Sequence, residues 1–311
     1  MPPCVGIAMR ELGRCLVTGG AGFIGSHLVE ALIGLGNPPR VLDDLSTGVR
    51  QQVAPQAEFL FGSLLDDAAL AAAVADVATI FHLAAATSVP QSWTDPEATE
   101  RINALGTVRL LDRAQAAGVR RLIYAASSSC YASQTGPVAE TAALAPASPY
   151  AVSKLAGEGY ARAYAAAGKL EVVSLRLFNV YGPRQRAESA YSGVIARFAH
   201  LLSVGGTPII YGDGEQSRDF VHVQDVVAAL LQAARVENLG AGEVFNIGSG
   251  TAVTVKELLR MLCWQRYRPL APRYEAARIG EVRHSQADIS RARQFLGWEP
   301  TIPLEAGLLT V

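Results

Sequence analysis

The chain has 311 residues, of which 50% are hydrophobic and 18% charged, and its 27 basic and 28 acidic side chains leave a net charge of −1. This composition supports a sizeable core in one or two domains and excludes a disordered chain. Because there is no basic excess, it also argues against a nucleic-acid partner and against an anionic membrane surface.

Location and metal binding are constrained by the same composition. No uncharged apolar run reaches the roughly 20 residues of a membrane-spanning helix, and residues 1–13 lack the apolar stretch of a signal peptide. We therefore expect a cytoplasmic protein. The four cysteines are far apart, and neither they nor the five histidines have metal-ligand spacing, so we expect free thiols and no metal site.

Short apolar runs alternate with longer alanine-rich stretches over the first 177 residues. The apolar runs predict strands at residues 14–18, 41–42, 59–61, 78–83, 122–126 and 172–177. Helical spacing of apolar residues predicts helices at residues 23–35, 66–74, 96–117 and 150–167. Short strands that alternate with longer helices are typical of βαβ units and a parallel sheet.

The pattern changes after about residue 177. Residues 179–192 and 207–217 are rich in glycine, proline and polar residues and predict loops, whereas residues 220–223 and 225–234 predict one more strand and helix. We therefore expect an α/β protein with a Rossmann-type, doubly wound parallel sheet and a smaller mixed α/β domain. The predicted domains are residues 1–176 plus 219–246 and residues 177–218 plus 247–311.

A glycine-rich motif, Thr18-Gly19-Gly20-Ala21-Gly22-Phe23-Ile24-Gly25, joins the first predicted strand to the first helix. Gly19 and Gly22 allow a tight turn whose backbone N–H groups approach a pyrophosphate, and Gly25 allows close packing of the helix on the sheet. Asp43, at the end of the second strand, is placed to accept hydrogen bonds from an adenosine ribose. Because no arginine directly follows Asp43, NAD is favoured over NADP. The alternative is an ordinary glycine turn with Asp43 capping a strand.

A second motif places a tyrosine and a lysine on one face of the predicted helix 150–167. Tyr150 and Lys154 are four residues apart, and a lysine ammonium beside a phenol lowers the tyrosine pKa. Tyr150 could then act as a general base. Ser127 and Ser128 follow the strand 122–126, at the edge of the sheet where ligands bind in open α/β folds. A solvated surface pair and a polar loop are the alternatives.

Together with several other segments, these motifs resemble the NAD-dependent epimerase/dehydratase family of extended short-chain dehydrogenases/reductases, and especially its UDP-glucose and UDP-N-acetylglucosamine 4-epimerases. The resemblance covers nearly the whole chain, at residues 18–25, 43, 82–85, 103, 127–131, 150–154, 176–182, 211–219 and 246–248.

The resemblance also implies roles for individual residues. Contacts to NAD are implied for Gly19, Gly22, Phe23, Ile24, Gly25, Asp43, Leu83, Ala84, Ala85, Asn103, Tyr150 and Lys154. Contacts to the substrate are implied for Ser127, Ser128, Tyr150, Asn179, Tyr211, Arg218, Arg278 and Ser285. Among these, Tyr211 would pack near the uracil and the two arginines would bind the diphosphate, a geometry that suits guanidinium groups. Ser63 stands where the family often has an aspartate at the adenine.

The function implied is a UDP-hexose 4-epimerase that works through a transient 4-keto sugar with tightly bound NAD. Tyr150 would remove the proton of the 4-hydroxyl, Ser127 would orient the 4-oxygen, and Lys154 would hold the nicotinamide ribose. Three serines at residues 127–129, where the family's dehydratases carry Thr-Asp-Glu, disfavour dehydration. The small Ser285 favours UDP-GlcNAc and UDP-GalNAc as the substrates.

Three alternatives stay open. The enzyme could be a 4-epimerase for UDP-glucose and UDP-galactose, or a UDP-uronic acid 4-epimerase or decarboxylase. From another class, it could be an NAD-sensing protein on the same fold, although such a protein would usually lack the Tyr150 and Lys154 pair. The resemblance also implies a homodimer, formed through a four-helix contact of residues 96–117 and 150–167.

Overall fold

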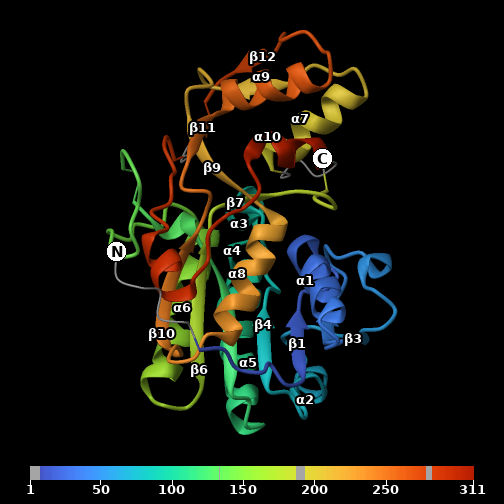
Figure 1. Ribbon diagram of the computed structural model, residues 1–311, viewed down its shortest axis with the longest axis vertical. Helices are drawn as coiled ribbons and strands as arrows, with labels where there is room; N and C mark the ends of the chain where they lie inside the picture. Colours follow the sequence, from blue (N-terminus) through green and yellow to red (C-terminus); the bar gives the residue numbers. More distant parts are fainter. Residues whose placement is uncertain (1–7, 133, 187–192, 278–281) are drawn as a thin grey trace.

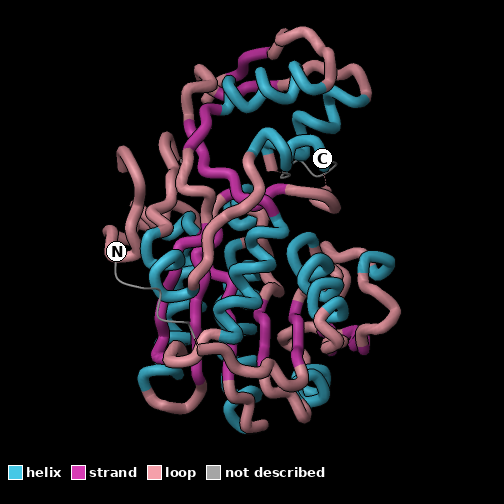
Figure 2. Tube along the Cα trace, in the orientation of Figure 1, coloured by secondary structure: helices cyan, strands magenta, loops and turns pink. Residues whose placement is uncertain are grey.

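A parallel sheet forms the centre of the protein. The computed structural model describes residues 8–132, 134–186, 193–277 and 282–311, and within these ranges seven strands are ordered β10-β6-β5-β4-β1-β2-β3 (Figures 1 and 2). The strands are β1 (Cys15–Thr18), β2 (Arg40–Asp43), β3 (Glu58–Phe61), β4 (Thr79–His82), β5 (Arg121–Ser127), β6 (Glu171–Leu177) and β10 (Ala241–Ile247). Their order and direction confirm the predicted Rossmann-type fold.

Helices cover both faces of this sheet, which explains why its strands are almost continuously apolar. On one face lie α1 (Phe23–Gly34) and α8 (Val223–Arg235). On the other lie α2 (Asp67–Val74), α5 (Gly106–Ala116) and α6 (Pro149–Ala166). The sheet therefore separates two hydrophobic clusters.

The predicted helix 96–117 is formed by three successive elements. These are α4 (Pro96–Glu100), the π-helical turn η2 (Arg101–Leu105) and α5. Asp95 caps the first turn, since its side chain accepts a hydrogen bond from the backbone N–H of Ala98. A π-helical turn inserts one residue into the helical repeat and is often found near functional sites; here it carries Asn103.

A smaller group of elements lies beyond the carboxyl ends of the strands, at the top of Figure 1. One sheet is formed by β7 (Asn179–Tyr181), β9 (Ser217–His222) and β11 (Ala252–Thr254), and another by β8 (Ile209–Tyr211) with β12 (Arg273–Glu275). Both sheets pack with α7 (Val194–Ser203) and α9 (Val255–Gln265), whose apolar faces form a third cluster. The expected loops 179–192 and 207–217 therefore contain strands, which are short and stabilised only by distant partners.

The last part of the chain returns to the large domain. Leu296, in the turn η4 (Ala292–Leu296), and Trp298 join the hydrophobic cluster beside α8. The Trp298 indole donates a hydrogen bond to the carbonyl oxygen of Asp225 at 2.9 Å. The chain then forms α10 (Leu304–Gly307) and the turn η5 (Leu308–Thr310) beside the smaller domain. The domain boundaries stay a prediction, and these contacts place part of residues 247–311 against the larger unit.

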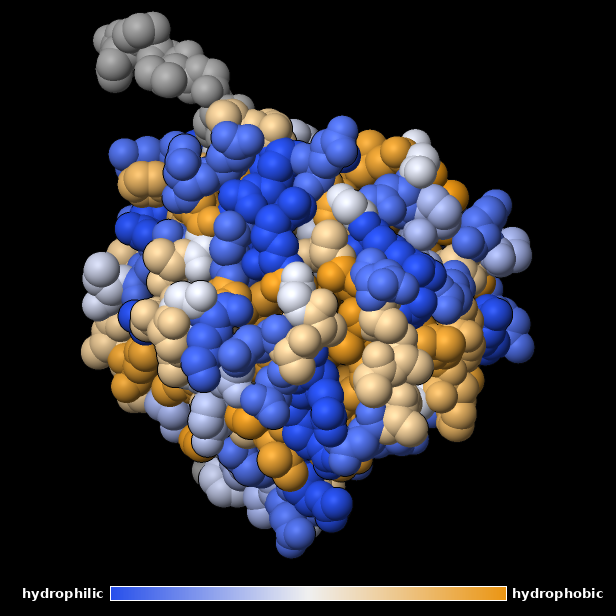
Figure 3. Space-filling view, turned by 90° about the horizontal axis from the view of Figure 1, so that it is seen from below, coloured by the Kyte–Doolittle hydropathy of each residue, from blue (hydrophilic) through white to orange (hydrophobic). Residues whose placement is uncertain are grey.

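The surface of the described part mixes polar and apolar residues. Seen from below Figure 1, hydrophilic and hydrophobic residues are interspersed over the face of the molecule (Figure 3). Within the described ranges no helix combines the length and apolar character needed to cross a membrane. The thiols of Cys15, Cys130 and Cys263 are free and buried, whereas Cys4 lies outside the described residues.

Candidate active site

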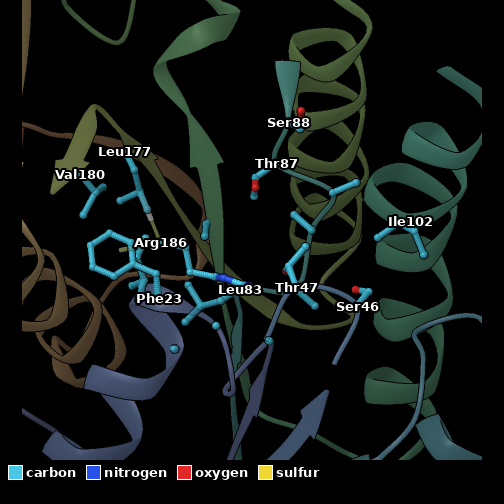
Figure 4. Close-up of a pocket in the computed structure, with 18 of the residues that line it drawn as sticks. Phe23, Ser46, Thr47, Leu83, Thr87, Ser88, Ile102, Leu177, Val180 and Arg186 are labelled. Atoms are coloured by element: carbon cyan, nitrogen blue, oxygen red, sulfur yellow. The ribbon is translucent and has the colours of Figure 1, made fainter. Parts of the chain in front are cut away.

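A cavity of about 1110 Å³ lies at the carboxyl ends of β1, β2, β4, β5 and β6. Ligands bind at this edge in open α/β sheets. Figure 4 shows the lining residues Phe23, Leu177, Val180 and Arg186 on one side of the view and Ser46, Thr47 and Ile102 on the other. Residues from the N-terminal part and from the middle of the chain therefore meet in one cavity.

The glycine-rich turn forms one end of this cavity. Gly19 has a φ of 73° and lies so close to the loop after β4 that a Cβ atom would be 2.7 Å from the backbone nitrogen of Ala84. A Cβ atom at Gly25 would lie 2.1 Å from the carbonyl oxygen of Gly19. The turn is therefore sterically restricted to glycine, and Gly22, Phe23 and Ile24 line the cavity at the start of α1. These features fit a dinucleotide pyrophosphate at a helix N-terminus.

Asp43 lies at the other side of the turn, at the end of β2. Its carboxylate accepts hydrogen bonds from the backbone N–H groups of Ala21 at 2.9 Å and Leu45 at 2.8 Å. Burial raises the pKa of Asp43 above its ordinary value, and these two hydrogen bonds oppose the rise. The carboxylate is thus held in one orientation at the cavity wall, with accepting capacity left for ribose hydroxyls. Ser63 also lines the cavity.

The loop after β4 is stabilised from behind by Asn103. Leu83, Ala84 and Ala85 line the cavity, but Asn103 is only 1% exposed. Its side-chain amide bonds both backbone groups of Ala86 and donates to the Ser153 hydroxyl at 2.9 Å. Asn103 therefore links the cofactor loop to α6, so that its predicted part in cofactor binding would be indirect.

A buried histidine continues this framework. The His82 ring contacts the Thr18 hydroxyl at 2.8 Å and the Thr107 hydroxyl at 2.9 Å, and Thr107 donates to the carbonyl oxygen of Asn103. Burial, together with the smaller effect of the Lys154 charge, lowers the pKa of His82 to about 3. The histidine is therefore neutral, and it connects β1, β4 and α5 beneath the cavity floor.

Tyr150 and Lys154 lie one turn apart at the start of α6 and both line the cavity. Ser148 caps this helix through the backbone N–H of Ala151, which fixes where the first turn begins. Burial lowers the pKa of Lys154 to about 7, an effect opposed by the carboxylate of Glu158. Its ammonium nitrogen lies 4.5 Å from the centroid of the Tyr124 ring, a cation–π arrangement.

Burial raises the pKa of Tyr150, while a hydrogen bond with the Ser127 side chain lowers it and the nearby Cys130 thiol raises it. The sequence predicts that the Lys154 charge lowers the pKa of Tyr150. Among the protein's own side chains this lowering is not found, because burial raises the pKa more than the hydrogen bond with Ser127 lowers it. Ser127 lines the cavity at the end of β5 and shares a hydrogen bond of 2.8 Å with the Ser129 hydroxyl. Tyr150 and Ser127 are therefore hydrogen-bonded neighbours in the cavity wall.

The predicted substrate residues fall into two groups. Ser127, Tyr150 and Asn179 line the cavity, and Asn179 donates to the carbonyl oxygen of Asp219 at 3.2 Å. Four others do not line this cavity in the described part of the chain: Ser128, Tyr211, Arg218 and Ser285. The backbone N–H of Ser285 donates to the carbonyl oxygen of Ser217 at 3.2 Å, so it lies beside β9. Arg278 is outside the described residues.

The structure adds cavity residues that the sequence reasoning missed. Thr87, Ser88 and Gln91 line it at the start of α3 (Val89–Thr94), and Arg184 and Arg186 line it beyond β7. The first three lie within eight residues of the end of the predicted strand 78–83, and this proximity could have indicated them. The two arginines lie in a segment with no periodic pattern, and only tertiary packing reveals them.

Asp219 is a further residue that the sequence pattern did not single out, and its carboxylate joins several segments of the chain. Its carboxylate is completely buried on β9 and accepts hydrogen bonds from the backbone N–H groups of Ser249, Gly250 and Ala287 and from the Ser249 hydroxyl. Burial raises the pKa of Asp219, and these four hydrogen bonds oppose the rise. It therefore holds the segment that contains Ser285 against β9.

Comparison with known proteins identifies the family. The model of the NAD dependent epimerase/dehydratase family matches residues 15–248. UDP-glucose 4-epimerase of Mycolicibacterium smegmatis is 39% identical over 304 residues, which cover 95% of this chain and 96% of that protein.

Two solved structures extend the comparison. The UDP-N-acetylglucosamine 4-epimerase of Methanobrevibacter ruminantium in complex with UDP-N-acetylmuramic acid has a TM-score of 0.90 and 32% identity, covering 96% of both chains. MoeE5 in complex with UDP-glucuronic acid and NAD has a TM-score of 0.87 and 40% identity, covering 96% of this chain and 97% of that one. The chain belongs to the NAD-dependent epimerase/dehydratase family of extended short-chain dehydrogenases/reductases, and its cofactor is NAD.

Proposed function

We propose that this protein is a UDP-hexose 4-epimerase. The observation that carries the proposal is the meeting of Ser127, Tyr150 and Lys154 with the glycine-rich turn and Asp43 in one cavity. Asn179 supplies a polar contact for the nucleotide diphosphate in the same cavity. A non-catalytic NAD sensor would not need an acid–base tyrosine at this place.

The side chains of the cavity have distinct roles in this reaction. Tyr150 takes the proton of the 4-hydroxyl and returns it after the sugar has turned over, and Ser127 donates a hydrogen bond that orients the 4-oxygen. Lys154 binds ribose hydroxyls of the cofactor, and its charge favours the phenolate of Tyr150. When bound, NAD would supply a hydride acceptor for C4 and, in its reduced form, the donor that returns the hydride to the 4-keto sugar, so that no net oxidation occurs.

For the hexose, the first candidate is the N-acetylated pair UDP-GlcNAc and UDP-GalNAc. It is supported by the small Ser285 in the segment held by Asp219 and by the relative from Methanobrevibacter ruminantium. Ser285→Tyr would place a ring beside β9. Because Ser285 does not line the cavity in the described residues, this variant tests whether its segment closes on the sugar. Selective loss of turnover of the N-acetylated pair, with UDP-glucose and UDP-galactose still reacting, would support the assignment, and unchanged turnover would remove it.

The second candidate is a UDP-uronic acid, and the observation that favours it is a cation in the cavity. The side chain of Arg186 is drawn inside the same cavity as Phe23 and Leu83 in Figure 4. A guanidinium binds a carboxylate through paired, charge-assisted hydrogen bonds. MoeE5, which is 40% identical, is known in complex with UDP-glucuronic acid.

One experiment separates these candidates. The purified protein is incubated with UDP-glucose, UDP-GlcNAc or UDP-glucuronic acid, and the 4-epimer is quantified by chromatography to give kcat/KM. If the uronic acid is the substrate, Arg186→Gln lowers its kcat/KM by about 10- to 100-fold, the size of a hydrogen bond between charged groups, without this effect on UDP-glucose. Formation of a UDP-pentose would instead indicate the decarboxylase, and no 4-epimer from any sugar would refute the proposal.

We also propose that the protein forms a homodimer and works in the cytoplasm. Leu105 in η2 and Val152 and Tyr160 in α6 are 46–48% exposed although they are apolar. These elements correspond to the helices of the expected four-helix contact. Burying their exposed apolar side chains against a second subunit would stabilise the dimer. The cytoplasmic location rests on the free thiols and the sequence alone.

A further inference from the structure

A short segment after β7 crosses from the smaller domain to α1. We name residues 183–186 the clasp segment. It follows Gly182, and Arg184, Gln185 and Arg186 all line the cavity together with Phe23 and Ile24 at the start of α1. The clasp segment and the pyrophosphate-binding turn therefore face the same space from two separate parts of the chain.

Two contacts fasten the clasp segment to α1. The His27 ring nitrogen Nε2 donates a hydrogen bond to the carbonyl oxygen of Pro183 at 3.0 Å. One turn further along α1, the Glu30 carboxylate pairs with Nη2 of Arg184 at 2.5 Å. The side chains of Arg184 and Glu30 are 28% and 47% exposed, so the ion pair is only partly screened by water.

The backbone of the clasp segment is held in an unfavourable conformation. Arg184 has a φ of 68°, in the left-handed region that glycine adopts at lower energy. Non-glycine residues in this region persist where surrounding contacts fix them, and they cluster at ligand-binding sites. Here the two contacts with α1 supply that constraint, and a glycine at this position would lose one of them.

The clasp segment also has unused hydrogen-bonding groups. Gln185 donates from Nε2 to the carbonyl oxygen of Val180 at 3.1 Å, but its Oε1 is buried without a protein partner. The same is true of Nη1 of Arg184. Buried polar atoms are normally paired. The protein neighbours of the clasp segment therefore leave a donor and an acceptor unused beside the cavity.

We propose that the clasp segment retains the bound NAD, and that the contacts of Glu30 and His27 hold it closed. The glycine-rich turn and the start of α1 bind the pyrophosphate from one side, while the clasp segment, fastened to the same helix, closes the cavity from the other. NAD can leave only when the clasp segment separates from α1. This role goes beyond the proposed function, because it does not depend on which sugar reacts.

The test measures NAD release directly. The holoenzyme is saturated with NAD, desalted, and incubated with charcoal that adsorbs released NAD, and the NAD remaining on the protein is quantified by chromatography over time. Glu30→Gln and Arg184→Gln each release NAD about five-fold faster, the size expected for a partly exposed ion pair. Because both substitutions break the same ion pair, the double variant releases NAD no faster than either single variant. High salt accelerates release from the wild type but not from these variants.

A second variant separates retention from folding. Arg184→Gly removes the guanidinium but accepts the left-handed backbone, so it should not lower the melting temperature of the NAD-free protein, and it should still release NAD faster. The control is Glu257→Gln, which breaks an ion pair of the same length with Arg260 on α9, away from the cavity. Unchanged release from Glu30→Gln or Arg184→Gly, or equal acceleration by Glu257→Gln, would overturn the proposal.

Discussion

The buried Lys154 predicts a specific dependence of stability on pH. Burial lowers the pKa of Lys154 from 10.5 to about 7. Between these two values the unfolded chain binds a proton that the folded protein does not, so the contribution of Lys154 to stability rises with pH. At low pH both states are protonated, and the folded protein bears the full cost of burying the charge. The substitution Lys154→Met removes this cost because the methionine side chain is uncharged.

The size of the effect follows from the pKa difference. The 3.5 units between 10.5 and about 7 correspond to about 5 kcal/mol at about 1.4 kcal/mol per unit. About 3 kcal/mol of this is recovered between pH 7 and pH 9.5. At about 2 °C per kcal/mol for a chain of this size, the melting temperature of Lys154→Met should exceed that of the wild type at pH 7, and the gap should shrink by about 6 °C by pH 9.5.

The assay is thermal unfolding of the NAD-free proteins at a fixed scan rate from pH 6.5 to 9.5. Lys169→Met provides the control, since Lys169 is exposed and its variant should follow the wild type at every pH. A gap between Lys154→Met and the wild type that stays constant with pH would refute the argument that a charge is buried at cost. With NAD added, the wild type should gain more stability than Lys154→Met, because the ribose gives the ammonium a partner.

Three further predictions concern catalysis, cofactor choice and assembly. Tyr150→Phe should lower 4-epimerisation by roughly 10²–10⁴-fold with NAD content unchanged, and near wild-type turnover would exclude Tyr150 as the base. Asp43→Asn should weaken NAD retention and allow NADP to bind, because the carboxylate that repels a 2′-phosphate is gone; co-purification of the wild type with NADP would contradict this. Val152→Asp should convert the dimer into monomers in light scattering, and a monomeric wild type would disprove the expected contact.

The sequence by itself determined the fold class and the principal residues of the cavity. The alternation of apolar strands and alanine-rich helices predicted six of the strands and all five helices of the central sheet, because their periodicity is local. The glycine-rich turn and Asp43 were recognisable because their spacing follows from a single strand–turn–helix unit. Tyr150 and Lys154 share a helix face for the same reason.

Only the tertiary structure decided what depends on contacts between distant segments. The strands β7 and β8 are three residues long and exist because β9 and β12 pair with them. The direction of the Tyr150 pKa depends on burial, which no local pattern specifies. Arg184 meets Glu30 across 154 positions of the chain, and Asn103, which was expected to contact NAD, lies behind the loop after β4. Local spacing determines which face a residue occupies, whereas packing determines what that face meets.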